Sequence, residues 1–388
     1  MRSLSSLDQT AFSELVERAH DVQFSDQFPT TGSFIKLRRH NREYWYHRTL
    51  ERGDGSAPPK LRSKYVGPVD DVEVTRRVEN ASALKADYTA RRKLASQLRR
   101  SGLPSPSATE GEAIEKLAAN GLFRLRAILV GSHAFQAYGG LLGIKLDRAT
   151  YRTDDIDIAQ FYSISVLVDD SMTDIGNILE EVDSTFKPIF NAFSPNLVAG
   201  YRNKAGLKIE ILTPNRGDAD YGRGLSKLPA LGDIGAQALP FLDFLIYEPV
   251  RSVVLHGAGV GVVVPAPQRF AVHKLILSTR RQGGMEAASK VSKDLAQSAS
   301  LIRGLAEAKQ DFELGAAWME AWRRGPKWRK HLAIGSLRLQ DSDFGLLEDA
   351  VCYAEKMTGT DRRRHGMGDG KEGLVNFRRR MGGVRPQT

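Results

Sequence analysis

The sequence contains a single cysteine, Cys352, among 388 residues. One cysteine cannot form a disulfide framework or a zinc cluster, so we expect a reducing compartment. The chain also lacks any run near ~20 apolar residues, the length that spans a bilayer, and its N-terminus has no apolar secretory core. These absences argue against a disulfide-stapled, secreted or membrane-spanning protein, and we expect a cytoplasmic location without membrane contact.

The composition is typical of a globular protein of two or three domains, with 41% hydrophobic and 26% charged residues. Lysine and arginine outnumber the acidic residues, which gives a formal net charge of +10. A positive balance of this size favours a polyanionic partner but does not identify it.

Residues 127–159 carry the most informative pattern in the chain. Their first segment, Ala127–Val130, is a short apolar run that predicts a buried strand. Gly131 and Ser132 follow directly, where we expect the strand to turn into a helix. Glycine permits a close approach of the backbone, so N–H groups and the serine hydroxyl at such a turn are suited to hold a phosphate.

Two acidic residues end the same stretch. Asp155 and Asp157 alternate with isoleucines, so in a strand both carboxylates lie on one face. Neighbouring carboxylates repel each other unless a cation neutralises them, and oxygen ligands suit Mg²⁺ or Mn²⁺. A phosphate cradle and metal-binding carboxylates on one platform indicate phosphoryl or nucleotidyl transfer.

This ordered set resembles the signature of the nucleotidyltransferase superfamily that includes DNA polymerase β. That signature is hydrophobic-Gly-Ser, a spacer, then Asp-hydrophobic-Asp-hydrophobic, matched here by residues 130–132 and 155–158. The resemblance implies an α+β fold with a mixed β-sheet and flanking helices. The 22 residues between Ser132 and Asp155 exceed the usual spacer, so we expect residues 139–152 to form an added loop or strand.

A third carboxylate follows further along the chain. Two runs within residues 196–212 predict a hairpin, and in its second strand Glu210 shares a face with Lys208. Superfamily members place a third carboxylate on the strand next to the aspartate pair, so the resemblance implies that Glu210 activates the attacking hydroxyl and helps to hold the metal. The alternative is an ordinary solvent-facing glutamate. A second Asp-x-Asp pair, Asp218 and Asp220, lacks flanking apolar residues and is expected to be a solvated loop.

A helix is predicted to begin at Pro267, which suits a first helical turn. The chain here resembles bacterial nucleotidyltransferases of the toxin and phage-defence kind, which carry a lysine in a helix after the catalytic sheet and later a Lys-Asp or Arg-Asp pair. By that resemblance Lys274 would neutralise charge on the triphosphate, and Asp294 would orient Lys274 or contact the nucleotide. Three further residues are candidate binding residues: His273 would contact the substrate, and Arg280 and Arg281 would contact phosphates. For each of them a purely structural role is the alternative.

The rest of the chain is predicted from composition and periodicity. Residues 1–105 would form a helix, a small β-meander and a second helix, and residues 106–265 the catalytic domain, in which residues 163–168 continue a strand. Residues 266–357 would form a helical bundle, and residues 358–388 a flexible arginine-rich tail. The meander interleaves basic and aromatic residues; it is either a nucleic-acid surface or a small sheet whose aromatic side chains pack on the main domain.

The sequence therefore predicts an enzyme that moves NMP from an NTP to a hydroxyl acceptor and releases pyrophosphate, with Mg²⁺ or Mn²⁺ as cofactor. The charge favours RNA as acceptor, and the family analogy suggests transfer-RNA 3′ ends. AMP transfer to a protein hydroxyl, a small-molecule acceptor, a two-metal nuclease and an inactive nucleotide- or nucleic-acid-binding scaffold stay open, and no antitoxin partner is identified. The predicted catalytic and metal-binding residues are Asp155, Asp157 and Glu210; the predicted nucleotide-binding residues are Gly131, Ser132, His273, Lys274 and Asp294.

Overall fold

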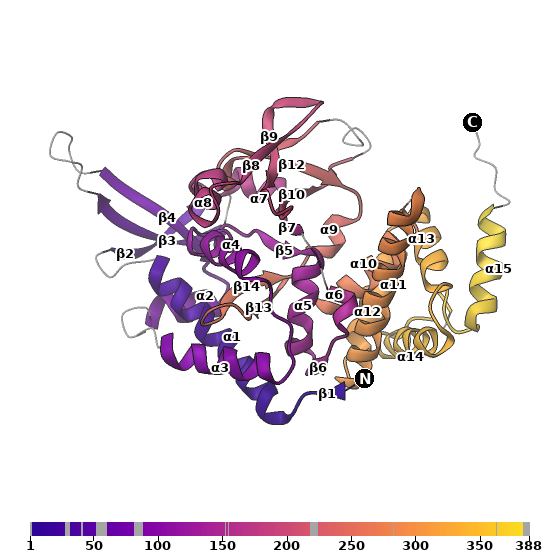
Figure 1. Ribbon diagram of the computed structural model, residues 1–388. Helices are drawn as coiled ribbons and strands as arrows, with labels where there is room; N and C mark the ends of the chain where they lie inside the picture. Colours follow the sequence, from indigo (N-terminus) through magenta and orange to yellow (C-terminus); the bar gives the residue numbers. More distant parts are fainter. Residues whose placement is uncertain are drawn as a thin grey trace. The chain divides into compact units, whose positions relative to one another are not determined.

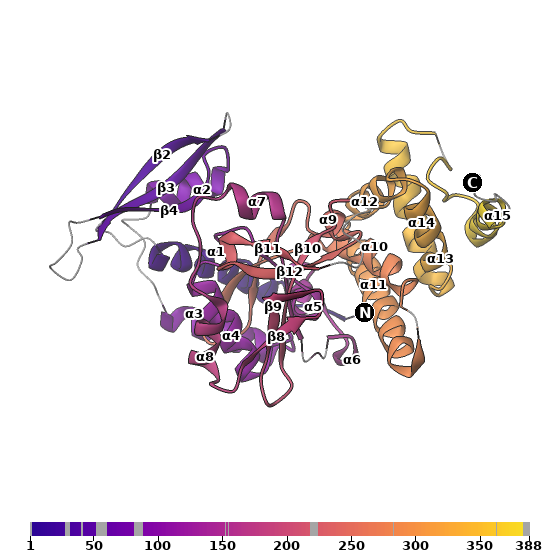
Figure 2. The same cartoon turned by 90° about the horizontal axis from the view of Figure 1, so that it is seen from above.

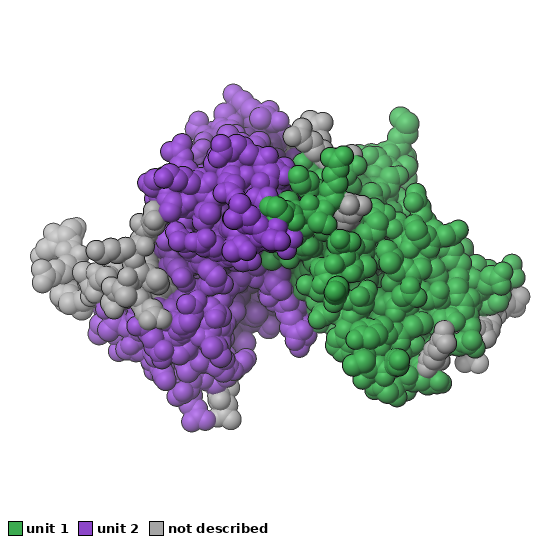
Figure 3. All heavy atoms as spheres, turned by 90° about the horizontal axis from the view of Figure 1, so that it is seen from below, with its two compact units in different colours: residues 1–5, 138–152, 265–388 green, residues 6–137, 153–264 purple. Residues whose placement is uncertain are grey.

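The computed structural model describes residues 2–27, 32–39, 42–51, 60–80, 88–151, 153, 155–217, 224–281, 283–361 and 363–382 (Figures 1 and 2). The chain forms two compact units (Figure 3). Unit 1 comprises residues 1–5, 138–152 and 265–388, and unit 2 comprises residues 6–137 and 153–264. These two units do not coincide with the four predicted segments. Most of the N-terminal segment belongs to the same unit as the predicted catalytic domain, and the long spacer belongs to the same unit as the C-terminal helices.

The centre of unit 2 is a mixed seven-stranded sheet, which confirms the predicted α+β class. Its strand order is β11-β12-β10-β7-β5, and β9 pairs with β10 and with β8. The central strand β10 is parallel to β7 and β12 but antiparallel to β9, while β5 is antiparallel to β7. The strands are β5 (Ile128–Val130), β7 (Asp155–Ala159), β8 (Lys187–Asn191), β9 (Ser194–Arg202), β10 (Lys208–Pro214), β11 (Ser226–Leu228) and β12 (Ile234–Leu239).

Alternation of side chains sets the faces of this sheet. Ile156 and Ile158 of β7 are fully buried, as are Ile209 and Ile211 of β10, while the acidic residues between them are half-buried. The pattern buries one face in the core and leaves the acidic face accessible. The helices around the sheet are α4 (Ala108–Ala119), α5 (Gly131–Leu141), which ends in unit 1, and α8 (Ile175–Val182).

One predicted strand of unit 2 is wrong. Residues 163–168 alternate like a strand but form helix α7 (Tyr162–Leu167). The hydroxyl of Ser165 is buried there and accepts a hydrogen bond from the backbone N–H of Ala230, at 3.1 Å. Tertiary contacts therefore override the strand propensity of this short run.

The predicted meander is an antiparallel sheet of β2 (Ser33–Arg39), β3 (Arg42–Glu51) and β4 (Lys60–Pro68). Helix α2 (Val72–Asn80) covers one face, where Phe34 and Trp45 pack with Val66 and Val74. The Trp45 indole also donates a hydrogen bond to Thr75 Oγ1 at 2.8 Å. These two aromatic side chains are therefore packed rather than free, but they pack on α2 of the N-terminal segment and not on the predicted catalytic domain. Unit 2 also contains α1 (Ser6–Gln27), α3 (Tyr88–Arg100), the 3₁₀ helix η2 (Pro229–Leu231), α9 (Leu242–Leu245), and the hairpin of β13 (Val250–Val254) and β14 (Val260–Val264).

Unit 1 is mainly helical, and its first long helix begins at Pro267 as predicted. The long spacer, predicted to form an added loop or strand, contains the two-residue strand β6 (Ile144–Lys145), which pairs with β1 (Arg2–Ser3) near the N-terminus. Among the described residues, no helix is both long and apolar enough to cross a membrane. The elements are β1 (Arg2–Ser3), β6 (Ile144–Lys145), α6 (Arg148–Tyr151), α10 (Pro267–Ser278), α11 (Gly284–Glu307), α12 (Asp311–Arg323), α13 (Pro326–Ser336), α14 (Asp341–Met357) and α15 (Gly370–Gly382).

The predicted flexible tail is wrong for residues 358–361 and 363–382, and residues 383–388 lie outside the described residues. His365 Nδ1 donates a hydrogen bond at 2.8 Å to Glu355, and both residues are 1% exposed. Leu374 of α15 is fully buried, and the Phe377 ring lies 5.0 Å from that of Trp322. A few apolar side chains and the buried His365–Glu355 pair therefore pack this segment against the helices before it, although its arginine- and glycine-rich composition is typical of disorder.

Candidate functional site in unit 2

The three predicted carboxylates lie on two adjacent parallel strands. In the pairing of β10 with β7, Glu210 is directly opposite Asp157, and Lys208 is directly opposite Asp155. Adjacent strands are about 4.8 Å apart, and residues two positions apart share a face. Asp155, Asp157, Lys208 and Glu210 therefore form a four-residue square on the accessible face of the sheet, three of whose corners are acidic.

The Gly-Ser turn lies next to this square. Val130, the last residue of β5, pairs with Asp157, so α5 begins at Gly131 beside the acidic face. Gly131 has a φ of +66°, and a Cβ there would lie 2.1 Å from Asp157 Oδ2. Only glycine fits both the backbone conformation and the position of the carboxylate. Ser132 is mostly buried in the first turn, where backbone N–H groups have no partner within the helix.

Lys208 is the cation of the square. Its ammonium group forms an ion pair with Glu210, and both side chains are partly exposed. Among the described residues, no three His, Cys, Asp or Glu side chains converge closely enough to hold a metal together. The donor chemistry of Asp155 and Asp157 fits Mg²⁺ or Mn²⁺, since both offer hard carboxylate oxygens on one face. Glu210 can act as a third metal ligand only if its carboxylate releases the Lys208 ammonium and binds the metal instead.

His133 is a site residue that sequence analysis missed, although it directly follows Gly131-Ser132. The ring is fully buried, and its Nδ1 lies 3.1 Å from the carbonyl oxygen of Asp155, to which it must donate. Its Nε2 lies 3.6 Å from Glu110 Oε2. Burial by itself would raise the pKa of Glu110, but contacts with His133 and the Ser107 backbone hold that pKa below its ordinary value. His133 thus connects the first turn of α5 to the start of β7.

The remaining predicted nucleotide-binding residues belong to unit 1. On α10, Lys274 is almost buried, and its Nζ donates a hydrogen bond at 2.7 Å to Asp294 of α11, which is 2% exposed. Arg281 Nε also donates to Asp294, at 2.9 Å. Burial alone would raise the pKa of Asp294, but the two cations hold it below its ordinary value. Asp294 therefore holds the Lys274 ammonium in place, and the role of this pair in nucleotide binding stays a prediction.

His273 is a packed histidine, which favours the structural alternative for it. Burial, with a contribution from the Lys274 charge, lowers its pKa to about 3, so the ring is neutral at physiological pH. Its Nε2 is buried without a hydrogen-bond partner among the described residues. Asp218 and Asp220, the second acidic pair, lie outside the described residues.

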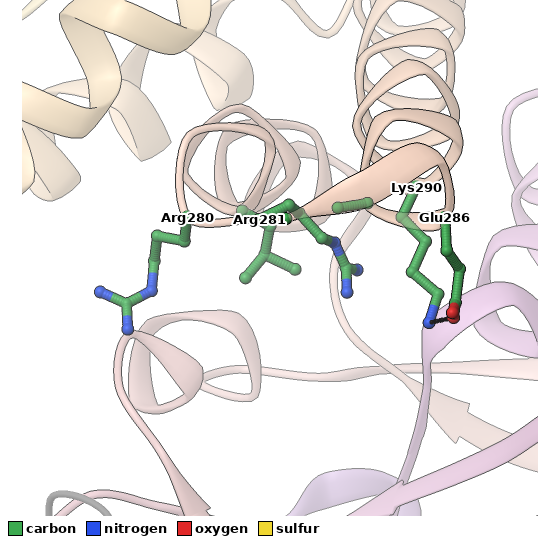
Figure 4. A pocket seen from close by; sticks show the side chains of 7 residues that line it. Arg280, Arg281, Glu286 and Lys290 are labelled. Carbon is green, nitrogen blue, oxygen red and sulfur yellow. Dashed lines mark hydrogen bonds and ion pairs between the residues drawn. The ribbon is translucent and has the colours of Figure 1, made fainter.

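A basic pocket of about 390 Å³ lies where α10 ends and α11 begins. Figure 4 shows the side chains of Arg280, Arg281 and Lys290 extending to the same side, with Lys290 paired to Glu286. The predicted phosphate contacts, Arg280 and Arg281, therefore line one pocket together with a further lysine.

Comparison with known proteins identifies the class. The family described as Nucleotidyltransferase matches residues 108–323, more than half of the chain. No curated protein sequence matches. The crystal structure of an antigenic nucleotidyltransferase-like protein from Paracoccidioides brasiliensis is 14% identical, with a TM-score of 0.27, and the alignment covers 59% of this chain and 94% of that one.

Proposed function

The chain belongs to the nucleotidyltransferase family, and on that premise we propose that unit 2 transfers NMP from an NTP to a hydroxyl acceptor. Asp155, Asp157 and Glu210 carry the chemistry in this proposal. The observation that supports it is the strand register, which aligns Glu210 with Asp157 and brings Gly131 against the Asp157 carboxylate.

Asp155 and Asp157 would hold the divalent cation, with Glu210 as the third oxygen donor. Bound there, Mg²⁺ or Mn²⁺ would neutralise negative charge on the triphosphate and on the departing pyrophosphate. Gly131 keeps the space that the Asp157 carboxylate needs, and His133 holds the main chain of Asp155.

Glu210 would act as the general base. Its carboxylate accepts the proton of the acceptor hydroxyl while the hydroxyl oxygen bonds to the α-phosphorus of the NTP. The bond from that phosphorus to the bridging oxygen breaks, and pyrophosphate leaves. Ser132 and the first N–H groups of α5 are suited to hold a phosphate oxygen during this step.

In this proposal the hydroxyl acceptor is RNA, because the protein carries a positive net charge. Transfer-RNA 3′ ends are one such acceptor. The net charge is +10, and the pocket of Arg280, Arg281 and Lys290 offers cations for phosphates. In the predicted assignment Lys274, oriented by Asp294, contributes to nucleotide binding.

The Lys208–Glu210 ion pair favours a second candidate function. A lysine that permanently neutralises Glu210 would leave a nucleotide-binding scaffold without its general base. Such a protein would bind NTP without transferring it.

Label transfer separates the two candidates. Purified protein is incubated with each α-labelled NTP, Mg²⁺ or Mn²⁺, total RNA and cell protein, next to the Asp155→Asn and Asp157→Asn variants. We expect label on RNA that depends on metal and is lost in both variants. NTP binding without label on any acceptor would support the scaffold instead.

A further inference from the structure

A small cavity lies on the side of Glu210 opposite Asp157. It holds about 180 Å³ and is lined by Lys208 and Glu210 of β10, by Phe190 and Asn191 of β8, and by Gln237 of β12, with apolar side chains between them. All of these residues belong to unit 2. The hairpin of β8 and β9 extends beside β10 (Figure 1).

The sheet topology explains the space. The first half of β10 pairs with β9 and the second half with β12, so its two partner strands meet beside Glu210. The residue of β9 directly opposite Glu210 is Gly200, where a Cβ would lie 2.3 Å from the carbonyl oxygen of Ile209. The close approach of the strands requires glycine, and glycine leaves the position next to Glu210 without a side chain.

The size of the cavity limits its occupant. Clefts that enclose a whole small-molecule ligand hold roughly 300–1,000 Å³. A cavity of about 180 Å³ therefore suits the terminal group of a longer acceptor rather than a complete free molecule.

The lining favours a planar, hydrogen-bonding group. Phe190 is an aromatic residue that is 56% exposed at the cavity, and Phe193, 74% exposed, lies in the turn of the same hairpin. Exposed rings of this kind stack on the bases of single-stranded nucleic acid. Asn191 Oδ1 accepts a hydrogen bond from the Phe193 N–H at 2.7 Å, which fixes the side chain, and the Gln237 amide adds further donors and acceptors.

We propose that this cavity is the acceptor site and that it takes the terminal nucleoside of a single-stranded RNA. The base stacks on Phe190, Asn191 and Gln237 bind its polar edge, and a ribose hydroxyl reaches Glu210. This inference rests on the proposed function, since Glu210 takes the hydroxyl proton in the transfer described above.

The test measures transfer from α-labelled NTP to a mixed-sequence single-stranded RNA oligonucleotide and, in a separate reaction, to total cell protein. Loss of one base–aromatic stack weakens binding about 5- to 150-fold. We expect Phe190→Ala to raise the KM for RNA by a factor in this range and Phe190→Tyr to restore it, while Phe312→Ala, a partly exposed aromatic residue of α12, changes nothing. NTP affinity, measured without RNA, monitors the nucleotide site separately.

The outcomes distinguish this inference from the proposed function. A KM for RNA that is unchanged in Phe190→Ala would overturn the acceptor site and leave the transferase function standing. Label on cell protein but not on RNA would overturn the nucleoside assignment alone. No label on any acceptor would overturn the proposed function itself.

Discussion

Glu210 lies directly opposite Asp157 in the parallel pairing of β10 with β7. On its other side, Glu210 faces Gly200 of β9 and the small cavity. The two pairings of β10, with β7 on one side and β9 on the other, therefore set the candidate general base between the candidate metal ligands and the candidate acceptor site.

Gly131→Ala tests whether the turn positions Asp157. The added methyl group would lie 2.1 Å from Asp157 Oδ2, at a φ of +66°, so the carboxylate must move. A displacement near 1 Å costs roughly 100-fold in rate, and we expect a loss of that size in label transfer. Gly345→Ala in α14, where a Cβ meets nothing within 4 Å, is the control and should keep full activity. Equal activity in both variants would argue against the positioning role.

Lys208→Met tests whether the lysine competes with the metal for Glu210. Both side chains of the pair are partly exposed, so the interaction is worth less than about 1 kcal/mol. Removing Lys208 should therefore raise the Mn²⁺ affinity by up to about five-fold, measured by isothermal titration calorimetry. Lys227→Met removes a comparable surface ion pair, with Asp233, and should leave the affinity unchanged. Weaker binding in Lys208→Met would show that the lysine supports the metal site instead.

The buried Lys274–Asp294 pair allows a double-variant test. Lys274→Met leaves a buried carboxylate whose remaining ion-pair partner among the described residues is Arg281, and breaking a buried pair costs about 3–5 kcal/mol. In urea unfolding we expect a loss of this order, and Lys274→Met/Asp294→Asn should recover most of it. NTP binding then separates the roles. If Lys274 contacts phosphate, the stable double variant should bind NTP more weakly than the unmodified protein. If the lysine acts only in packing, the two should bind NTP equally well.

His273 makes stability depend on pH. Because burial lowers its pKa in the fold to about 3 from an ordinary 6.5, the neutral ring contributes its full stability above pH 6.5. That contribution is lost as the pH falls toward 3, by about 1.4 kcal/mol per pH unit. Urea unfolding between pH 7.5 and 5 should show a smaller loss of unfolding free energy for His273→Leu than for the unmodified protein. Between pH 7.5 and 8.5 the two should change in parallel, and identical slopes below pH 6.5 would contradict the assignment.

Much of the site follows from local patterns in the sequence. Alternation of acids with isoleucines predicted the accessible face of β7, and the apolar run before Gly131 predicted β5 and the turn. The hairpin that carries Glu210 and the helix that begins at Pro267 were also predicted, because short-range periodicity and turn residues determine them.

Long-range contacts explain what the sequence did not reveal. Nothing local shows that the spacer belongs to unit 1, or that His133 donates to the carbonyl of Asp155. Strand alternation predicts that Lys208 shares a face with Glu210, but the ion pair between them depends on the conformations of both side chains. The strand β8, which carries Phe190, has no clear alternation, and so the acceptor cavity could not be predicted.

The central claim is that the carboxylates of β7 and β10 bind the divalent cation that nucleotidyl transfer requires. Electron paramagnetic resonance of free Mn²⁺ measures this binding directly in the unmodified protein, Asp157→Asn and Glu210→Gln. The control is Glu286→Gln, which removes one negative charge from an exposed side chain of unit 1. We predict that Mn²⁺ binds to the unmodified protein and the control alike, at least about ten-fold more weakly to Asp157→Asn, and also more weakly to Glu210→Gln. Mn²⁺ affinity that is equal in all four proteins would contradict the claim.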